Sequence, residues 1–282
     1  MSPEVVSGRD NMKSVTCRLE VTRLAEDREE RLVDVVIKER PVTIFLNDVE
    51  VATLMCTPRS LEYLAIGFLF AEGLVRGKKD IKRVFAEEED GVVWVETRNS
   101  VRLPENLVAR RYVTTGCGKS LTFVDASKAK TDLRIHSEFK LPIGSVRKLM
   151  KEFFQKSRLF KLTGGVHSAA ICSPVGILVY NEDIGRHSAI DKAVGECVLK
   201  GIRTKDRILL TSGRISSDIL VKTARSGAAI LVSKSAPTDL AVKLATDFGI
   251  TLIGFARGTR MNVYSNAWRI VTKDDVKERT RK

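Results

Sequence analysis

The feature that most constrains the fold is a regular alternation of apolar runs and helix-like segments in the C-terminal half of the chain. The strand-like runs are GILVYN, RILLTSG, AAILVSKS and TLIGFAR, and the helix-like segments are RHSAIDKAVGECVLKG, SSDILVKTARSG and APTDLAVKLATDFG. Gly227 and Gly249 stand where helices should stop, and Pro237 stands where one should begin. Strands that alternate with helices predict an α/β layer with an at least partly parallel sheet.

Shorter β-like runs dominate the chain between about residues 15 and 101. Apolar and polar residues alternate in VTCRLEV, RLVDVVI, PVTIFLN, VEVATLMC and GVVWVE, as is typical of half-buried strands. One helix interrupts them in TPRSLEYLAIGFLFAEGLV, where apolar residues recur at spacings of three and four and Gly73 can end the helix. The N-terminal part therefore predicts a smaller, β-rich α+β domain.

A polar stretch over residues 125–142 is a natural connector between these two parts. The helix-like sequence SVRKLMKEFFQKSRLF follows it, with Val146, Leu149 and Phe153 on one face. We expect four segments. They are a flexible tail (1–14), a β-rich domain that contains Cys117 (15–135), an α/β domain (136–275) and a basic tail (276–282).

The net charge of +13 indicates either a polyanionic partner or a solvated basic surface. The five cysteines are odd in number and never closer than 25 residues, which argues against a disulfide framework and fits a reducing compartment. The N-terminus has neither a basic start nor an apolar run, so we expect no signal peptide. Residues 162–181 carry no charge, but their glycines, serines and proline indicate buried strands and a loop, with no membrane partner.

The stretch VTTGCGKS, which begins at Val113, admits several interpretations. It is not a phosphate-binding loop, because Val113 stands where the first glycine should be. It is not a dithiol, because Thr114 and Ser120 stand three residues on either side of Cys117. The local sequence leaves two possibilities, a reactive thiol whose thiolate Lys119 favours or an inert cysteine in a turn.

Three strand ends are each followed by glycine and arginine. Carboxyl ends of parallel strands share one edge of a sheet, so these segments predict a crevice there for a phosphate or carboxylate ligand. The alternative is that the arginines pair with Glu182, Asp183 and Asp218 on the surface. The helix after the first segment also has Ser188 and Asp191 at the spacing of a capping box. The three segments are Gly185-Arg186-His187, Gly213-Arg214 and GFARGTRMN, which contains Arg257 and Arg260.

Two of the three histidines, His167 and His187, fall in this region and invite a test for zinc chemistry. Zinc deaminases require H-x-E together with P-C-x-x-C, whereas His167 is followed by Ser168-Ala169 and no C-x-x-C occurs in the chain. No G-x-S-x-G elbow supports a serine nucleophile. We therefore expect no metal ligated by the protein. Nor does an aromatic platform or a reading helix indicate nucleic-acid binding.

Long segments of this chain resemble the formate dehydrogenase accessory protein family (FdhD/NarQ) from about residue 30 to residue 266. The resemblance implies a cytidine-deaminase-like three-layer domain that has lost its zinc ligands, a smaller N-terminal domain and a homodimer. It also implies a cytoplasmic sulfur carrier that takes sulfur from a cysteine desulfurase. The sulfur passes to molybdenum bis(molybdopterin guanine dinucleotide), a bound substrate that then enters the formate dehydrogenase catalytic subunit. The segments include VEVATLMCTPRSLEYLAIGFLFAEGLV, TGGVHSAAI, NEDIGRHSAIDKAVG and LLTSGRISSDILVKTARSGAAILVSKSAPTDLAVKLATDFGITLIGFARGTRMNVYS.

The resemblance also implies roles for individual residues. The family loop C-x-x-C-G-K places its second cysteine on Cys117, which takes the persulfide role, and its first on Thr114, where this chain departs from the family. The alternative is a non-catalytic cofactor-binding chaperone whose loop has lost its chemistry. The family's molybdopterin-binding segment matches FARGTR, and Arg186, His187 and Arg214 join it as expected cofactor contacts. That segment comprises Phe255, Ala256, Arg257, Gly258, Thr259 and Arg260.

Overall fold

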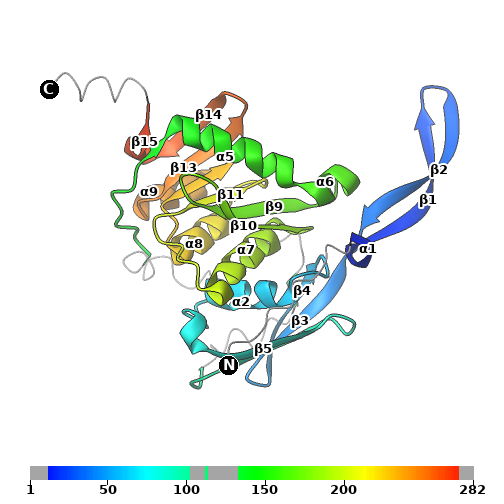
Figure 1. Cartoon of the computed structure of the whole chain (residues 1–282), viewed down its shortest axis with the longest axis horizontal. Coiled ribbons are helices and arrows are strands. Elements are labelled where there is room, and N and C mark those ends of the chain that lie inside the picture. Colours follow the sequence, from blue (N-terminus) through cyan, green and yellow to red (C-terminus); the bar gives the residue numbers. More distant parts are fainter. Residues whose placement is uncertain (1–11, 102–111, 114–132, 273–282) are drawn as a thin grey trace.

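The computed structural model describes residues 12–101, 112–113 and 133–272 (Figure 1). Its largest sheet has six strands in the order β10-β9-β11-β12-β13-β14. Strands β11, β12 and β13 are parallel to one another, and the other three pair antiparallel with their neighbours. The strands are β9 (His167–Cys172), β10 (Ile177–Asp183), β11 (Ile208–Thr211), β12 (Ile230–Ser233), β13 (Thr251–Arg257) and β14 (Arg260–Ser265).

Helices cover both faces of this sheet and make three layers (Figure 1). Ile208 and Leu210 point toward α5, while Leu209 packs against the helices of the opposite face. Burial on both faces explains why β11 and β12 are continuous apolar runs rather than alternating ones. The α/β fold class predicted from the alternation is confirmed. One face carries α5 (Ile143–Lys156), which leads into α6 (Arg158–Thr163), and the other carries α7 (Arg186–Lys200), α8 (Ser217–Ser226) and α9 (Asp239–Asp247).

A second, five-stranded sheet in the order β5-β6-β3-β4-β7 forms the N-terminal part. The helix α2 (Leu61–Ala71) packs its apolar side chains against this sheet. The sequence pattern does not single out β5, because most of its side chains are exposed. The strands are β3 (Arg40–Leu46), β4 (Val49–Cys56), β5 (Ile81–Glu87), β6 (Val92–Thr97) and β7 (Tyr112–Val113), with the short helix η1 (Lys78–Asp80) before β5.

Helix α2 also joins the two sheets, because its other side lies against α7 (Figure 1). The two helices meet at glycines. A Cβ atom on Gly67 would lie 1.8 Å from the Asp191 carbonyl oxygen, and one on Gly195 would lie 1.9 Å from the Tyr63 carbonyl oxygen. Only glycine lets the two backbones approach this closely.

A hairpin arm projects from the body of the molecule (Figure 1). It consists of β1 (Thr16–Ala25) and β2 (Arg28–Ile37), which pair antiparallel over their whole length. Toward the C-terminus, η2 (Ala267–Arg269) leads into β15 (Ile270–Val271), which pairs parallel with β8 (Leu141–Pro142) from the middle of the chain. None of the helices in the described ranges is long and apolar enough to cross a membrane.

The expected domain boundary at residues 135 and 136 stays a prediction. Leu133 and Ile135 pack against the core beneath α7, α8 and α9, and the Ile135 amide donates to the Phe248 carbonyl oxygen at 2.7 Å. The two expected tails lie mostly outside the described residues. Of the N-terminal one, only Met12 and the residues after it are described, in the short helix α1 (Met12–Val15).

Helix ends follow the sequence signals only in part. Gly227 and Gly249 adopt left-handed backbone conformations (φ 78° and 69°) where α8 and α9 end, as predicted. The predicted helix start at Pro237 is wrong, because α9 begins at Asp239 with Thr238 as its N-cap. The capping box in α7 is also wrong, because Gly185 precedes the helix and Asp191 forms a buried ion pair with Lys222 at 2.6 Å.

The Thr238 cap supports a stability prediction. Its hydroxyl accepts a hydrogen bond from the Ala241 amide at 3.3 Å. We expect Thr238→Ala to lower the free energy of unfolding by about 1 kcal/mol, measured by urea denaturation. Ser216, the N-cap of α8, makes no such bond, so Ser216→Ala is the matched control and should change stability much less. Equal losses would contradict the capping role.

Candidate functional site

The three glycine–arginine segments meet at one edge of the large sheet, as the sequence predicts. Strands β11, β12 and β13 all end there, and β10 ends beside the first residue of β9, since Asp183 pairs with His167. Direct hydrogen bonds tie neighbouring strand ends together. The Ser233 hydroxyl donates to the Gly213 carbonyl oxygen at 2.6 Å, and the Phe255 amide donates to the Ser235 carbonyl oxygen at 3.1 Å. The edge is therefore one continuous surface.

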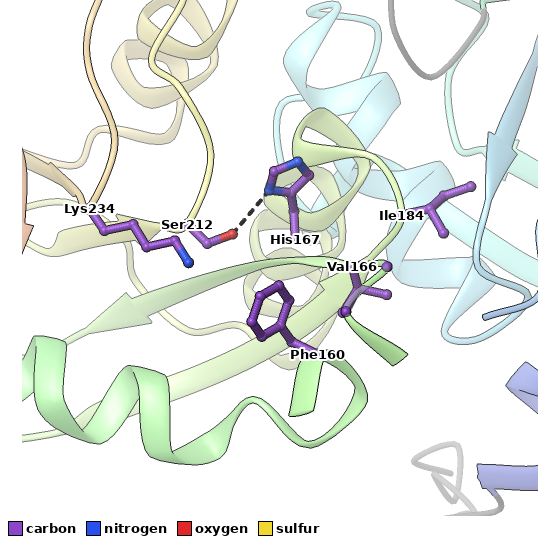
Figure 2. A pocket seen from close by; sticks show the side chains of 8 residues that line it. Phe160, Val166, His167, Ile184, Ser212 and Lys234 are labelled. Carbon is purple, nitrogen blue, oxygen red and sulfur yellow. Dashed lines mark hydrogen bonds between the residues drawn. The ribbon is translucent and has the colours of Figure 1, made fainter. Parts of the chain in front are cut away.

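A pocket of about 280 Å³ opens at this edge, where β9, β11 and β12 meet the end of α6 (Figure 2). His167 and Ser212 form its polar wall, with His167 Nδ1 3.2 Å from Ser212 Oγ. The Ser212 hydroxyl also accepts a hydrogen bond from the Ser168 amide at 2.9 Å, which fixes its position. The pocket is lined by Phe160, Gly164, Gly165, Val166, His167, Ile184, Ser212 and Lys234.

The pocket is positively charged. Burial lowers the pKa of His167, and the nearby charges of Arg186 and Lys234 lower it further, so the imidazole is neutral at pH 7. The Lys234 ammonium lies 5.2 and 5.0 Å from the ring centroids of Phe154 and Phe160. Within the described part of the chain, no carboxylate lies within ion-pair distance of Lys234. The charge of Lys234 is therefore available to an anion.

The predicted arginines surround this edge. Arg186 packs on Gly213, where a Cβ atom would lie 2.8 Å from the Arg186 Cβ, and Arg214 is exposed. The Arg257 Nε donates to the Lys234 carbonyl oxygen at 3.1 Å, and Arg257 pairs with Arg260 across the β13–β14 hairpin. The segment from Phe255 to Arg260, including Gly258 and Thr259, is exposed except for the buried Ala256. Because Arg257 contacts the backbone of Lys234, this segment of β13 and the β13–β14 hairpin lies beside the pocket.

The alternative surface pairing of these arginines has limited support. Asp183 pairs with Lys192 at 2.6 Å, and Glu182 accepts a hydrogen bond from the Ser157 hydroxyl at 2.9 Å. Asp218 is the exception: burial raises its pKa, and the nearby charges of Lys222 and Arg186 offset part of that rise. Two of the three candidate carboxylates are therefore bonded to groups other than the predicted arginines.

His187 occupies a different environment from the pocket-lining residues. It lies in the first turn of α7, and burial is the main cause that lowers its pKa to about 3, followed by the charges of Lys222 and Arg186. Its Nε2 atom is buried and has no hydrogen-bond partner among the described residues. The structure does not bring His187 into the pocket lining, whereas it does bring His167 there.

A buried polar network connects the pocket wall to the N-terminal sheet through Thr57, the residue after β4. The Thr57 amide donates to Asp183 Oδ2 at 3.1 Å, and its hydroxyl accepts from the amide of Ile184, a pocket residue, at 3.2 Å. The Thr57 carbonyl oxygen accepts from Lys192 Nζ at 2.9 Å. The end of β4 is thereby fixed against the pocket.

Cys117 itself lies outside the described residues, but the strand that leads to it is described. Strand β7 runs parallel to β4, with Val113 paired to Leu54. The described end of β7 therefore lies at the same end of the sheet as Thr57, which contacts the pocket residue Ile184.

The other cysteines have environments that disfavour a thiolate. Cys56, Cys172 and Cys197 are buried, and burial raises their pKa, to about 12 for Cys56 and Cys197. Cys17, on the hairpin arm, is partly exposed. No cluster of His, Cys, Asp and Glu that could hold a metal ion occurs in the described ranges.

These environments predict a labelling pattern. In the native protein at pH 8, iodoacetamide should modify Cys17 and leave the three buried cysteines largely unmodified, because alkylation requires an accessible thiolate. Peptide mass spectrometry before and after denaturation measures the difference. Rapid native labelling of Cys56, Cys172 or Cys197 would contradict their burial.

Sequence reasoning missed the two other polar side chains of the pocket besides His167. Ser212 and Lys234 each follow a parallel strand directly, so they occupy the same kind of position as the predicted glycine–arginine segments. Their position directly after a strand was the one signal that could have identified them. Lys234 has no glycine beside it, and in the sequence it looks like any solvent-exposed surface lysine.

The three-layer fold and this charged pocket define an α/β protein with a candidate ligand crevice at the carboxyl edge of its sheet. The FdhD/NarQ family model matches residues 37–271, and the chain belongs to that family. A sulfur carrier protein FdhD from Bacillus subtilis is 40% identical over 256 residues, covering 91% of this chain and 98% of the relative.

Two further relatives agree. A sulfur carrier protein FdhD from Listeria innocua is 41% identical over 258 residues, covering 91% of this chain and 99% of the relative. The crystal structure of a formate dehydrogenase accessory protein from Desulfotalea psychrophila superposes with a TM-score of 0.76 at 25% identity, covering 91% of this chain and 100% of the other. The family resemblance noted in the sequence is thereby confirmed.

Proposed function

We propose that this protein is a sulfur carrier in the maturation of formate dehydrogenase. Relatives that match nearly the whole chain bear the name sulfur carrier protein FdhD, and a structural neighbour is a formate dehydrogenase accessory protein. In this proposal a cysteine desulfurase donates sulfur in the cytoplasm. The Cys117 thiolate attacks the terminal sulfur of the donor persulfide, a new S–S bond forms, and the donor cysteine leaves as a thiolate.

The observation that carries the proposal is the position of β7. Val113 lies beside Leu54, three residues before Thr57, whose hydroxyl bonds the pocket residue Ile184. Cys117 is four positions after Val113, and a chain of that length spans at most about 14 Å. In this proposal a persulfide on Cys117 approaches the pocket from the end of β7.

The sulfur acceptor in this proposal is molybdenum bis(molybdopterin guanine dinucleotide), carried as a substrate. Its pyrophosphates suit guanidinium partners, which form paired charge-assisted hydrogen bonds to phosphate. Arg257 and Arg260 on the hairpin, together with Arg186 and Arg214, offer such partners on one edge of the sheet. The loaded cofactor then passes to the formate dehydrogenase catalytic subunit.

Mass spectrometry tests the sulfur-carrier proposal directly. After incubation with a cysteine desulfurase and cysteine, the intact protein should gain the mass of one sulfur atom, located on the Cys117 peptide and removed by dithiothreitol. Absence of added sulfur on that peptide under conditions that load a relative with two loop cysteines would refute the proposal.

Thr114 favours a second candidate function, since the family places a cysteine there. In this alternative the protein is a non-catalytic chaperone that binds the cofactor and delivers it. Radiolabelled sulfur separates the two functions, because a chaperone would bind the cofactor and activate formate dehydrogenase without ever acquiring label from the desulfurase.

We also propose that the protein works as a homodimer in which a second copy covers the hairpin arm. An isolated two-stranded ribbon is marginally stable, yet Leu24 and Val33 on the arm are 74% and 57% exposed. Sedimentation equilibrium should give the mass of a dimer, and a Leu24→Glu, Val33→Glu variant should shift it toward the monomer. A monomeric wild-type protein at micromolar concentration would contradict the proposal.

A further inference from the structure

The pocket holds one positive charge in a fixed place. Figure 2 shows the Lys234 side chain extending toward Ser212 and His167 across the pocket. Its ammonium is held over two phenyl rings rather than by a carboxylate, so the position is defined while the charge is not neutralised. A cation in this state attracts an anion into the pocket.

The groups around Lys234 select among anions. Ser212 Oγ already accepts the Ser168 amide, and its remaining contact is to His167 Nδ1, so the polar wall offers few donors. The remaining lining consists of the apolar side chains of Phe160, Val166 and Ile184 and of the two glycines Gly164 and Gly165. A strongly hydrated oxyanion loses its water against such walls without full compensation.

Sulfur suits these walls better than oxygen. It is polarisable, less strongly hydrated and makes favourable contacts with aromatic rings, one of which Phe160 supplies. We propose that this pocket binds a sulfur-centred anion, such as the terminal sulfur of a persulfide, with Lys234 as its charge partner. This inference rests on the proposed function and adds a site for the sulfur itself, distinct from the arginines expected to hold the cofactor.

Thiosulfate and sulfate provide a matched pair of probes, because they have the same charge and shape and differ in one terminal atom. We titrate each into the full-length Cys117→Ser protein, which prevents covalent reaction, and follow the Cε1 proton of His167 by NMR. The chain has only three histidines, and the spectrum of His167→Gln identifies the signal. We expect thiosulfate to bind with a dissociation constant at least about tenfold lower than that of sulfate.

Variants of Lys234 test the role of the charge. Lys234→Met should weaken thiosulfate binding by about tenfold or more, whereas Lys234→Arg should retain most of it. Lys243→Met, which removes an exposed lysine of α9, is the matched control and should leave binding unchanged. Thermal unfolding of each variant shows that the fold is intact.

Equal binding of the two anions, tighter binding of sulfate, or thiosulfate binding that survives Lys234→Met would overturn the inference. Sulfur loading of Cys117 is measured separately, with the wild-type loop and a desulfurase. If Cys117 loads but the pocket prefers no sulfur anion, the inference fails and the sulfur-carrier function stands. If the pocket binds thiosulfate and Cys117 never loads, the proposed function fails instead.

Discussion

Replacing Cys117 with serine is expected to abolish sulfur loading by a cysteine desulfurase and to reduce activation of formate dehydrogenase by at least about 100-fold. A serine hydroxyl is not ionised at neutral pH and forms no persulfide, so no step through sulfur remains. Formate dehydrogenase activity in cells that lack their own carrier measures activation. Radiolabelled cysteine with the purified proteins measures loading.

Cys17→Ser is the matched control for this substitution. Cys17 is the one cysteine of the described ranges that is not buried, so it is the best competitor for the role of sulfur acceptor. Its loss should leave both loading and activation nearly unchanged. If Cys117→Ser retained full activity while Cys17→Ser lost it, the acceptor would lie on the hairpin arm. Full activity in both variants would favour the non-catalytic chaperone.

The α/β alternation of the large domain could be predicted from sequence, because buried strands and capped helices leave recognisable residue patterns. Strands covered on both faces must be apolar throughout, as in ILLT of β11 and ILVS of β12, and the helices between them carry glycines at their ends. Parallel strands bring their carboxyl ends to one edge, so the glycine–arginine segments after the strands predicted a crevice at that edge. These signals are local, and the sequence displays them directly.

Other features depend on contacts between distant residues, which spacing does not reveal. Asp191 has the spacing of a capping residue, yet it lies next to Lys222 from another helix and forms a buried ion pair instead. The link from Thr57 to Asp183 joins residues more than a hundred positions apart. In the sequence Lys234 resembles an ordinary surface lysine, but in the fold its ammonium lies over the rings of Phe154 and Phe160. Tertiary packing decides each of these cases.

The second large effect is expected at the contact between α2 and α7. We expect Gly67→Ala to lower the free energy of unfolding by about 3 kcal/mol or more and the melting temperature by about 6 °C or more. The new Cβ atom would lie 1.8 Å from the Asp191 carbonyl oxygen, which belongs to helix backbone and has no room to move alone. The two helices must separate, and that opens gaps in the cores on both sides.

Gly144→Ala is the matched control, because Gly144 is also a helical glycine and a Cβ atom there meets nothing within 4 Å. Alanine favours helix over glycine, so this variant should be unchanged or more stable by up to about 1 kcal/mol. Differential scanning calorimetry measures both variants. Equal effects at the two positions would show that helix propensity, rather than close packing, sets the outcome.

A double variant tests whether the two glycines act as one contact. Gly195→Ala alone should destabilise the protein about as much as Gly67→Ala, since its Cβ atom would lie 1.9 Å from the Tyr63 carbonyl oxygen and 2.7 Å from the Gly67 amide nitrogen. One separation of the helices relieves both clashes. The double variant should therefore lose clearly less stability than the sum of the single losses, because neighbouring sites are not additive. Full additivity would mean that each clash is relieved by its own local shift of α2 and α7. The contact that joins the two sheets would then not be a single rigid unit.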